Sequence, residues 1–183
     1  MIDYLSEKCG FSTENIILFG RSIGTGPAVY AAGRRPVGGL ILMSPYTSIR
    51  AVVKHIVGSV LQYAVAERFM NVNEISKVEC PTLFVHGKLD ELIPYQHSLE
   101  LHKNCICSTE VVLPDHMTHN EFNIFNDLLY PMARFLRKNG IRVQKDDYYG
   151  KVWFPAEVHL KTRETSKYRR ERSAMGHLYD RVK

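Results

Sequence analysis

The sequence predicts an α/β fold in which a mostly parallel sheet of about four strands is flanked by helices. Short apolar, largely β-branched runs alternate along the chain with stretches of helical periodicity, and Gly, Pro or Ser bounds each apolar run. Such runs are typical of strands buried on both faces of a parallel sheet. The alternation of strand and helix favours right-handed crossover connections.

The elements are expected in a regular order. Strands are predicted at residues 15–20, 39–45, 81–87 and 108–114, and helices at 23–32, 51–69, 97–103 and 127–138; residues 1–14 are long enough for one further helix. Pro131 must lie in the first turn of the last helix, because an interior position needs the backbone N–H that proline lacks. Basic residues before Asn139-Gly140 are typical of the end of that helix.

The charge divides the chain into a neutral body and a basic tail. Residues 1–140 hold 13 Lys/Arg and 13 Asp/Glu, whereas residues 141–183 hold 11 Lys/Arg and 6 Asp/Glu. With 45% hydrophobic residues among 183, the chain can fill the core of one domain. We therefore predict one domain at 1–140 and a flexible or partly helical tail at 141–183.

The same composition excludes several classes of protein. The 4 cysteines are too few and too irregularly spaced for a disulfide framework, and the first residues lack the basic and apolar regions of a signal peptide. No apolar run approaches the roughly 18 residues that a membrane span requires. The sequence predicts a cytoplasmic location with no membrane-spanning helix.

Residues 20–24 form a G-x-S-x-G motif between a predicted strand and a helix rich in small residues. In this setting the motif is typical of a nucleophile elbow, a sharp turn that exposes Ser22. Gly20 and Gly24 are expected to let the strand and helix backbones approach closely. The alternative is a glycine-rich turn that only packs a helix on the sheet or holds a phosphate.

A serine nucleophile needs a base and a group that orients the base. Asp90 follows the third predicted strand, and both His116 and His119 follow the fourth. The order serine, acid, histidine is the one expected for this fold. A solvated loop carboxylate is the alternative for Asp90, and the spacing alone leaves both histidines open as the base.

Four segments, LFGRSIGTGPA, LILMSPYTS, VECPTLFVHGKLDELIP and MTHNEF, resemble the motifs of α/β-hydrolase-domain serine hydrolases. They are most similar to the branch with membrane-associated protein depalmitoylases and related protist and fungal hydrolases. The resemblance covers about residues 4–140. It implies Ser22 as the nucleophile, Asp90 as the orienting acid, His119 as the base and the Ile23 N–H as an oxyanion donor, without a cofactor or metal.

In such hydrolases the strand before the nucleophile is the fifth, and a loop after the third supplies the second oxyanion donor. Only residues 1–14 precede that strand here. We therefore expect that the N-terminal strands and one oxyanion loop are missing, and that Met1 is internal to a longer protein or begins a truncated gene model. An open, aggregation-prone edge at 15–19 and weak or absent activity are expected to follow.

Several other side chains have competing interpretations. The set His97, His102, Cys105 and Cys107 matches no familiar zinc spacing, so we predict no metal site. We predict that His86 is a packed structural histidine and that Cys80 is an inert buried thiol. Arg21 is expected to pair with a neighbouring loop or with an acidic group of the substrate. The segment 51–70 either packs in the core or forms a lipid-facing cap.

The predicted function is hydrolysis of esters or thioesters through an acyl-enzyme, with an acyl lipid or a lipidated protein as substrate. A serine peptidase of the same fold and a truncated, non-catalytic interaction module are the alternatives. The basic segment 161–172 holds six Lys/Arg and two Glu, and Tyr148, Tyr149, Trp153 and Phe154 lie upstream. These features favour peripheral membrane contact over nucleic-acid binding.

Overall fold

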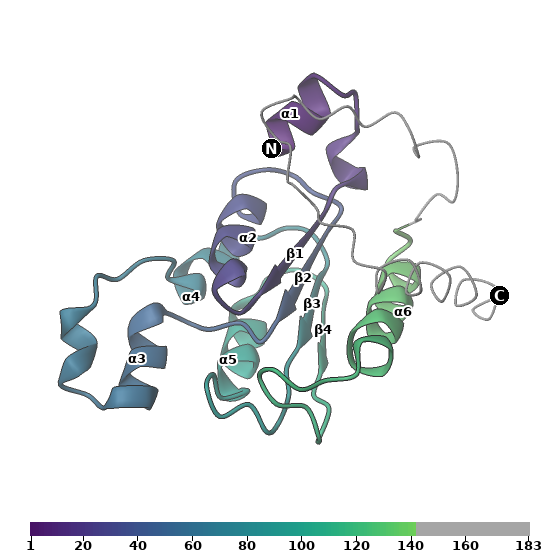
Figure 1. Cartoon of the computed structure of the whole chain (residues 1–183). Coiled ribbons are helices and arrows are strands. Elements are labelled where there is room, and N and C mark those ends of the chain that lie inside the picture. Colours follow the sequence, from purple (N-terminus) through teal and green to yellow (C-terminus); the bar gives the residue numbers. More distant parts are fainter. Residues whose placement is uncertain (142–183) are drawn as a thin grey trace, which may run out of the picture. The chain divides into compact units, whose positions relative to one another are not determined.

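The computed structural model describes residues 1–141, except for the side chains of residues 61 and 62 (Figure 1). Apart from residue 141, the predicted basic tail at 141–183 lies outside the described residues. The fold is therefore that of residues 1–141.

The described residues form a four-stranded parallel sheet in the order β1-β2-β3-β4. The strands are β1 (Ile17–Arg21), β2 (Gly39–Met43), β3 (Thr82–Val85) and β4 (Thr109–Val112). All four predicted strands and their parallel pairing are confirmed. Because the strands are parallel, their carboxyl ends meet at one edge of the sheet, and the segments with Ser22, Asp90 and His119 begin there.

The helical elements are α1 (Ile2–Glu7), η1 (Thr13–Asn15), η2 (Ser22–Gly24), α2 (Thr25–Ala32), α3 (Ile49–Val57), η3 (Leu61–Ala64), α4 (Asn71–Glu74), η4 (Ile75–Lys77), α5 (Gln96–Asn104), η5 (Ile124–Leu129) and α6 (Tyr130–Lys138). Two predicted boundaries were wrong. The helix expected at 51–69 stops before Gly58, whose φ is 89°. The residues before Tyr130 form a π-helix, η5, and Pro131 lies in the first turn of α6 as predicted.

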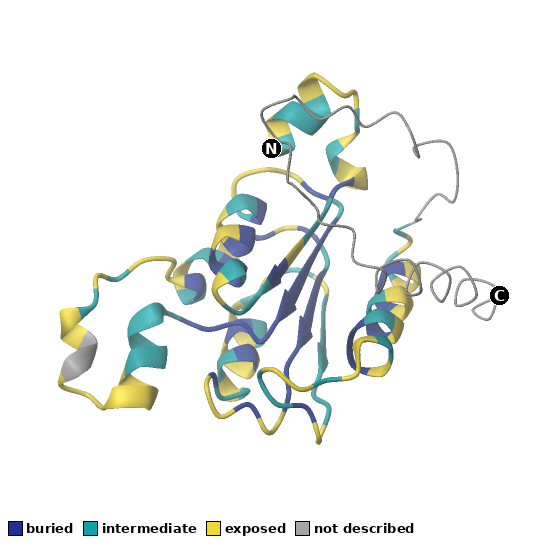
Figure 2. Cartoon of the chain, in the orientation of Figure 1, coloured by how far each residue is buried: buried dark blue, intermediate teal, exposed yellow. Residues whose placement is uncertain are grey.

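Two hydrophobic clusters hold the helices against the sheet. Alternate residues of β2 point to opposite faces: Leu40 and Leu42 pack in a cluster with residues of α2 and α5, whereas Ile41 and Met43 pack with residues of α6. Figure 1 shows α2 and α5 on one side of the sheet and α6 on the other, and the two inner strands, β2 and β3, are buried along their whole length (Figure 2). The sheet is therefore the rigid base of the site.

β1 is an edge strand. Within residues 1–141 it pairs only with β2, and the Phe19 side chain is 50% exposed. The expected open apolar edge is thus present in the described part of the chain. Aggregation through it stays a prediction.

The segment around α3 does not pack in the core. None of the nine residues of α3 is buried, and Val60, just beyond it, is 84% exposed. Figure 1 shows α3 to one side of the sheet, joined to it through extended segments. The core-packing interpretation was wrong, because α3 buries no residue against the sheet; a cap stays a prediction.

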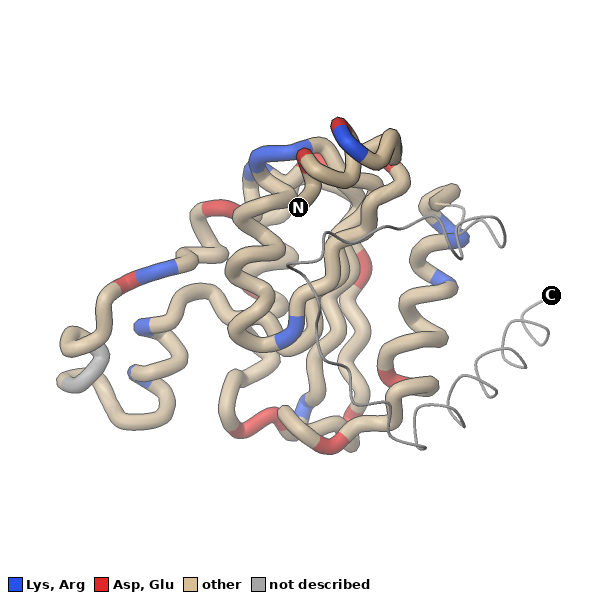
Figure 3. The backbone as a smooth tube through the Cα atoms, turned by 45° about the horizontal axis from the view of Figure 1, so that its top comes forward, with Lys and Arg blue, Asp and Glu red and all other residues tan. Residues whose placement is uncertain are grey.

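The surface of the described part carries both signs of charge. Basic and acidic positions are spread along the backbone tube in Figure 3, in keeping with their equal numbers in residues 1–140. No helix within the part of the chain that the structure describes has the length and apolar character needed to cross a membrane.

Candidate active site

Ser22 occupies a strained turn at the end of β1. Its φ is 51°, in the left-handed region that residues with a side chain rarely adopt. The Thr25 hydroxyl donates a hydrogen bond of 2.7 Å to the Ser22 carbonyl oxygen, which helps to hold the turn before α2 begins. This strand, turn and helix is the arrangement expected of a nucleophile elbow.

The two glycines of the motif differ in their steric role. A Cβ on Gly20 would lie 2.7 Å from the Gly24 carbonyl oxygen and 2.8 Å from the Thr25 Cα, too close for any side chain. A Cβ on Gly24 would meet no atom within 4 Å, and its φ of −67° suits any residue. The expectation that both glycines permit close approach therefore holds for Gly20 and was wrong for Gly24.

We predict that Gly20→Ala lowers the free energy of unfolding by about 1–3 kcal/mol or more, because the added methyl group meets backbone that cannot yield. Gly24→Ala is the matched control and should change it by less than about 1 kcal/mol. Urea unfolding followed by circular dichroism measures both. Equal losses would contradict this account of the elbow.

Asp90 and His119 are hydrogen-bonded across the carboxyl ends of β3 and β4. The distance from His119 Nδ1 to Asp90 Oδ2 is 2.8 Å, and Asp90 Oδ1 accepts the backbone N–H groups of Leu92 and Ile93 at 3.1 and 2.8 Å. Burial opposes ionisation of Asp90, but hydrogen bonds from His86, the Ile93 N–H and His119 outweigh it and hold the pKa of Asp90 well below its usual range. The carboxylate is therefore fixed and charged.

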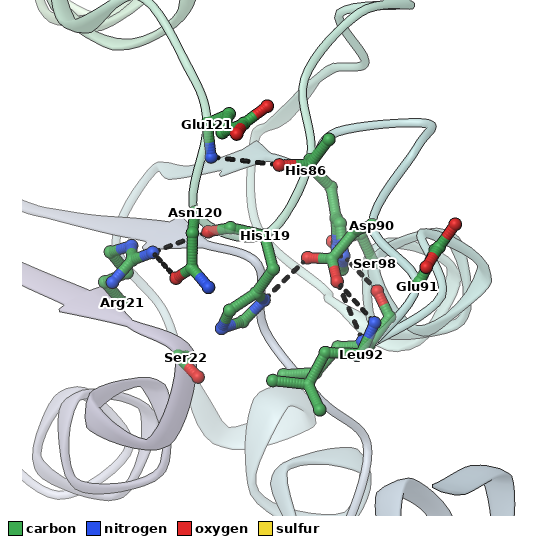
Figure 4. Close-up of polar contacts among 12 residues, drawn as sticks. Arg21, Ser22, His86, Asp90, Glu91, Leu92, Ser98, His119, Asn120 and Glu121 are labelled. Carbon is green, nitrogen blue, oxygen red and sulfur yellow. Dashed lines mark hydrogen bonds and ion pairs between the residues drawn. The ribbon is translucent and has the colours of Figure 1, made fainter.

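The His119 ring lies between Asp90 and Ser22. Figure 4 shows one ring nitrogen bonded to Asp90 and the other side of the ring facing the Ser22 hydroxyl. Because Nδ1 donates to the carboxylate, Nε2 is left free of a proton in the neutral ring and can accept one. The structure thus brings together the three residues that the sequence proposed.

His116 belongs to a different contact. Its Nε2 lies 3.1 Å from Oδ2 of buried Asp127, which also accepts the Asn123 N–H at 2.7 Å. The His116 side chain is largely exposed. Of the two histidines left open by the spacing, only His119 is bonded to Asp90.

Arg21 supports the loop that carries His119. Its Nη2 donates to the His119 carbonyl oxygen and to Asn120 Oδ1, and the guanidinium lies 5.6 Å from the centre of the Phe122 ring (Figure 4). Pairing with a neighbouring loop was one of the two interpretations of Arg21. The partners are a carbonyl, an amide and a ring rather than an acidic side chain.

Sequence reasoning missed the support behind Asp90. His86 is fully buried as expected, and its Nε2 lies 2.7 Å from the Ile93 carbonyl oxygen and 3.4 Å from Asp90 Oδ2. Since a carbonyl only accepts, Nε2 donates to it, and Nδ1 accepts from the Ser98 hydroxyl at 2.7 Å. The position of His86 at the end of β3, four residues before Asp90, was the available signal.

A second missed group lies behind the elbow. Asn71 Nδ2 donates to the Tyr46 carbonyl oxygen at 2.9 Å and to Thr25 Oγ1 at 3.3 Å, and the Tyr46 hydroxyl donates to the Ile23 carbonyl oxygen at 3.5 Å. Burial raises the pKa of Tyr46 to about 12, so the phenol stays protonated as a donor. These residues are far apart in the sequence, so the sequence alone gave no indication that they lie close together in the fold.

The two histidines considered for a metal make separate contacts, and Cys105 and Cys107 contact each other. His97 Nδ1 lies 2.9 Å from Thr47 Oγ1, and His102 Nδ1 lies 2.7 Å from Thr109 Oγ1. In residues 1–141, no group of three or more His, Cys, Asp or Glu side chains could hold a metal ion. Cys80 is buried as expected, and burial raises its pKa to about 12.

Solved structures of similar fold include two esterases. The chain is similar to a carboxylesterase from Lactobacillus plantarum WCFS1, with a TM-score of 0.61, 14% identity and coverage of 79% of this chain and 66% of that one. It is also similar to acetyl xylan esterase 1 from Thermoanaerobacterium sp. JW/SL YS485, with a TM-score of 0.59, 15% identity and coverage of 74% and 49%. The parallel sheet and the serine turn place the chain among proteins of the α/β-hydrolase fold.

Comparison with curated relatives identifies the family within this fold. The chain is 32% identical over 132 residues to human alpha/beta hydrolase domain-containing protein 17B, covering 72% of this chain and 45% of that protein. It is 31% identical over 134 residues to alpha/beta hydrolase domain-containing protein aho-3 of Caenorhabditis elegans, covering 73% and 40%. The chain belongs to the α/β-hydrolase-domain proteins. It spans less than half the length of these two relatives, and no protein-family model matches it.

Proposed function

We propose that the protein is a serine hydrolase that cleaves esters or thioesters through an acyl-enzyme. The observation that carries the proposal is the His119 ring, bonded to Asp90 at 2.8 Å and facing the Ser22 hydroxyl at the strained end of β1 (Figure 4). A buried carboxylate, an oriented imidazole and a serine within reach of that imidazole are the groups that acyl transfer to serine requires.

In the proposed reaction, His119 Nε2 accepts the Ser22 hydroxyl proton as the oxygen attacks the acyl carbon. The Ile23 N–H stabilises the negative charge on the carbonyl oxygen of the tetrahedral intermediate. His119 then gives its proton to the leaving alcohol or thiol, and the acyl group remains on Ser22. A water molecule deprotonated by His119 releases the acid and restores the serine.

The proposed substrates carry an acyl chain, as acyl lipids or S-acylated proteins do. The resemblance to protein depalmitoylases suggests this class. Exposed apolar side chains at and beyond α3, among them Ile56, Val57 and Val60, support it, because such a surface suits a lipid chain. We further propose a cytoplasmic location with peripheral membrane contact.

The first test is covalent labelling of the whole chain with a fluorophosphonate probe, which reacts with an activated serine. We expect labelling of the wild-type chain and its loss in Ser22→Ala, while Ser108→Ala, which changes an exposed serine before β4, labels normally. Labelling unaffected by Ser22→Ala, or none in a folded wild-type chain, would support the interaction module instead. A p-nitrophenyl ester panel compared with peptide substrates separates an esterase from a peptidase.

A separate prediction concerns membrane binding by the basic tail. Lysine and arginine near an anionic bilayer contribute about 1 kcal/mol each. We expect co-sedimentation with vesicles that contain anionic lipid, less with neutral vesicles, and loss of the difference when residues 141–183 are deleted. Binding that is insensitive to both lipid charge and the deletion would contradict membrane contact through the tail.

A further inference from the structure

Cys105 and Cys107 bring two thiols together in the turn between α5 and β4. Their sulfur atoms are 3.1 Å apart, and both residues are half-buried. Ile106 between them is 70% exposed, so the turn is open to solvent. Neither thiol has a part in the proposed acyl transfer, so the pair is free for another role.

The geometry suits a bond between the two sulfurs. A disulfide bond is about 2.05 Å long, so the sulfurs need to approach by only about 1 Å. Cys105 directly follows the last residue of α5 in an extended conformation, with φ −82° and ψ 130°. A short movement of an exposed turn can supply this approach without disturbing the sheet.

The two thiols are not equivalent. The Cys107 sulfur lies 3.1 Å from the Cys105 sulfur, which can donate to a thiolate, and 3.5 Å from the Thr82 hydroxyl, which donates to the Cys80 carbonyl oxygen. The hydrogen bond from Cys105 lowers the pKa of Cys107 although burial opposes it. The same pairing, with burial, raises the pKa of Cys105. We therefore expect Cys107 to be the thiol that ionises more readily and attacks first.

We propose that Cys105 and Cys107 form an oxidisable dithiol that hydrogen peroxide converts into an intramolecular disulfide. The Cys107 thiolate attacks one peroxide oxygen, the O–O bond breaks and hydroxide leaves, which gives a sulfenic acid on Cys107. The Cys105 sulfur attacks the Cys107 sulfur, the S–O bond breaks, and the thiol proton and hydroxide leave as water. Two thiols and one peroxide give one disulfide and two waters.

The chain contains its own control thiol. Cys80 is buried, and burial raises its pKa to about 12, so it should not react on the same time scale. Cys9 is exposed and could form disulfides between molecules. The full chain with Cys9→Ser is therefore the protein for the test.

The experiment treats this chain with hydrogen peroxide, blocks free thiols and identifies peptides by mass spectrometry. We expect the peptide with Cys105 and Cys107 to lose two hydrogen atoms, dithiothreitol to restore it, and Cys80 to stay reduced. Cys107→Ser should slow peroxide consumption at least about tenfold, and Cys105→Ser should leave a sulfenic acid on Cys107 that dimedone traps. The proposal is overturned if both cysteines stay free, if Cys80 oxidises as fast, or if only disulfides between molecules form.

Discussion

Replacing His119 with alanine is expected to lower kcat for ester hydrolysis by about 10⁴-fold or more, because in the proposed reaction His119 takes the Ser22 proton. His119 is bonded to Asp90 and faces Ser22, whereas His116 is exposed and bonded to Asp127 (Figure 4). His116→Ala is thus the matched control and should keep kcat within about threefold. The rate of fluorophosphonate labelling gives the same comparison where turnover is weak.

Equal losses in the two variants, or a larger loss for His116→Ala, would show that the base is assigned wrongly. Both proteins should retain the circular dichroism spectrum of the wild type; this control matters most for His119, whose side chain is 11% exposed, whereas that of His116 is 68% exposed. A higher KM at unchanged kcat would also contradict the assignment, because a base acts in the transition state rather than in binding.

Asp90→Asn is expected to lower kcat by about 10⁴-fold with only a modest change in substrate binding. An amide at this position offers His119 an N–H instead of a carboxylate oxygen, so the ring turns or adopts the tautomer that cannot accept the Ser22 proton. The amide oxygen can still accept the Leu92 and Ile93 N–H groups, which preserves the loop. Glu91→Gln, a change at an exposed neighbour, is the control and should keep kcat near that of the wild type.

Asp90 should also make stability depend on pH. Its pKa is lower in the folded protein than the unfolded value of about 3.9, so its stabilising contribution is present above that value and is lost as pH falls towards the folded pKa. The difference in free energy of unfolding between the wild type and Asp90→Asn should therefore shrink as pH falls below about 4. A difference that grows on acidification would contradict an ionised, hydrogen-bonded Asp90.

Local patterns in the chain were sufficient to predict the sheet. Apolar runs bounded by turn residues identified all four strands, and their alternation with helices indicated parallel pairing. The same patterns were weaker at helix ends, where η5 takes a π-helical path and Gly58 stops α3. Helical periodicity indicates an amphipathic segment but not whether anything covers its apolar side, and so the sequence left core packing and an exposed cap both open for the segment with α3.

The candidate triad could be predicted because parallel strands place their carboxyl ends at one edge. Ser22, Asp90 and both histidines each follow a strand, so their order in sequence was enough to propose a common site. The sequence order could not separate His116 from His119 without a family resemblance. The two histidines differ in their contacts in the fold, because His116 contacts Asp127 whereas His119 contacts Asp90.

The four strands, the elbow serine and the carboxyl-end positions of the acid and base were readable in the amino-acid sequence, because each depends on residues that are close along the chain. Tertiary structure alone decided the packing of His86 behind Asp90, the contact of Arg21 with the loop of His119, and the 3.1 Å between the thiols of Cys105 and Cys107. These contacts depend on side-chain direction and on the distance between separate loops. Local propensity and hydrophobic period carry no information about either.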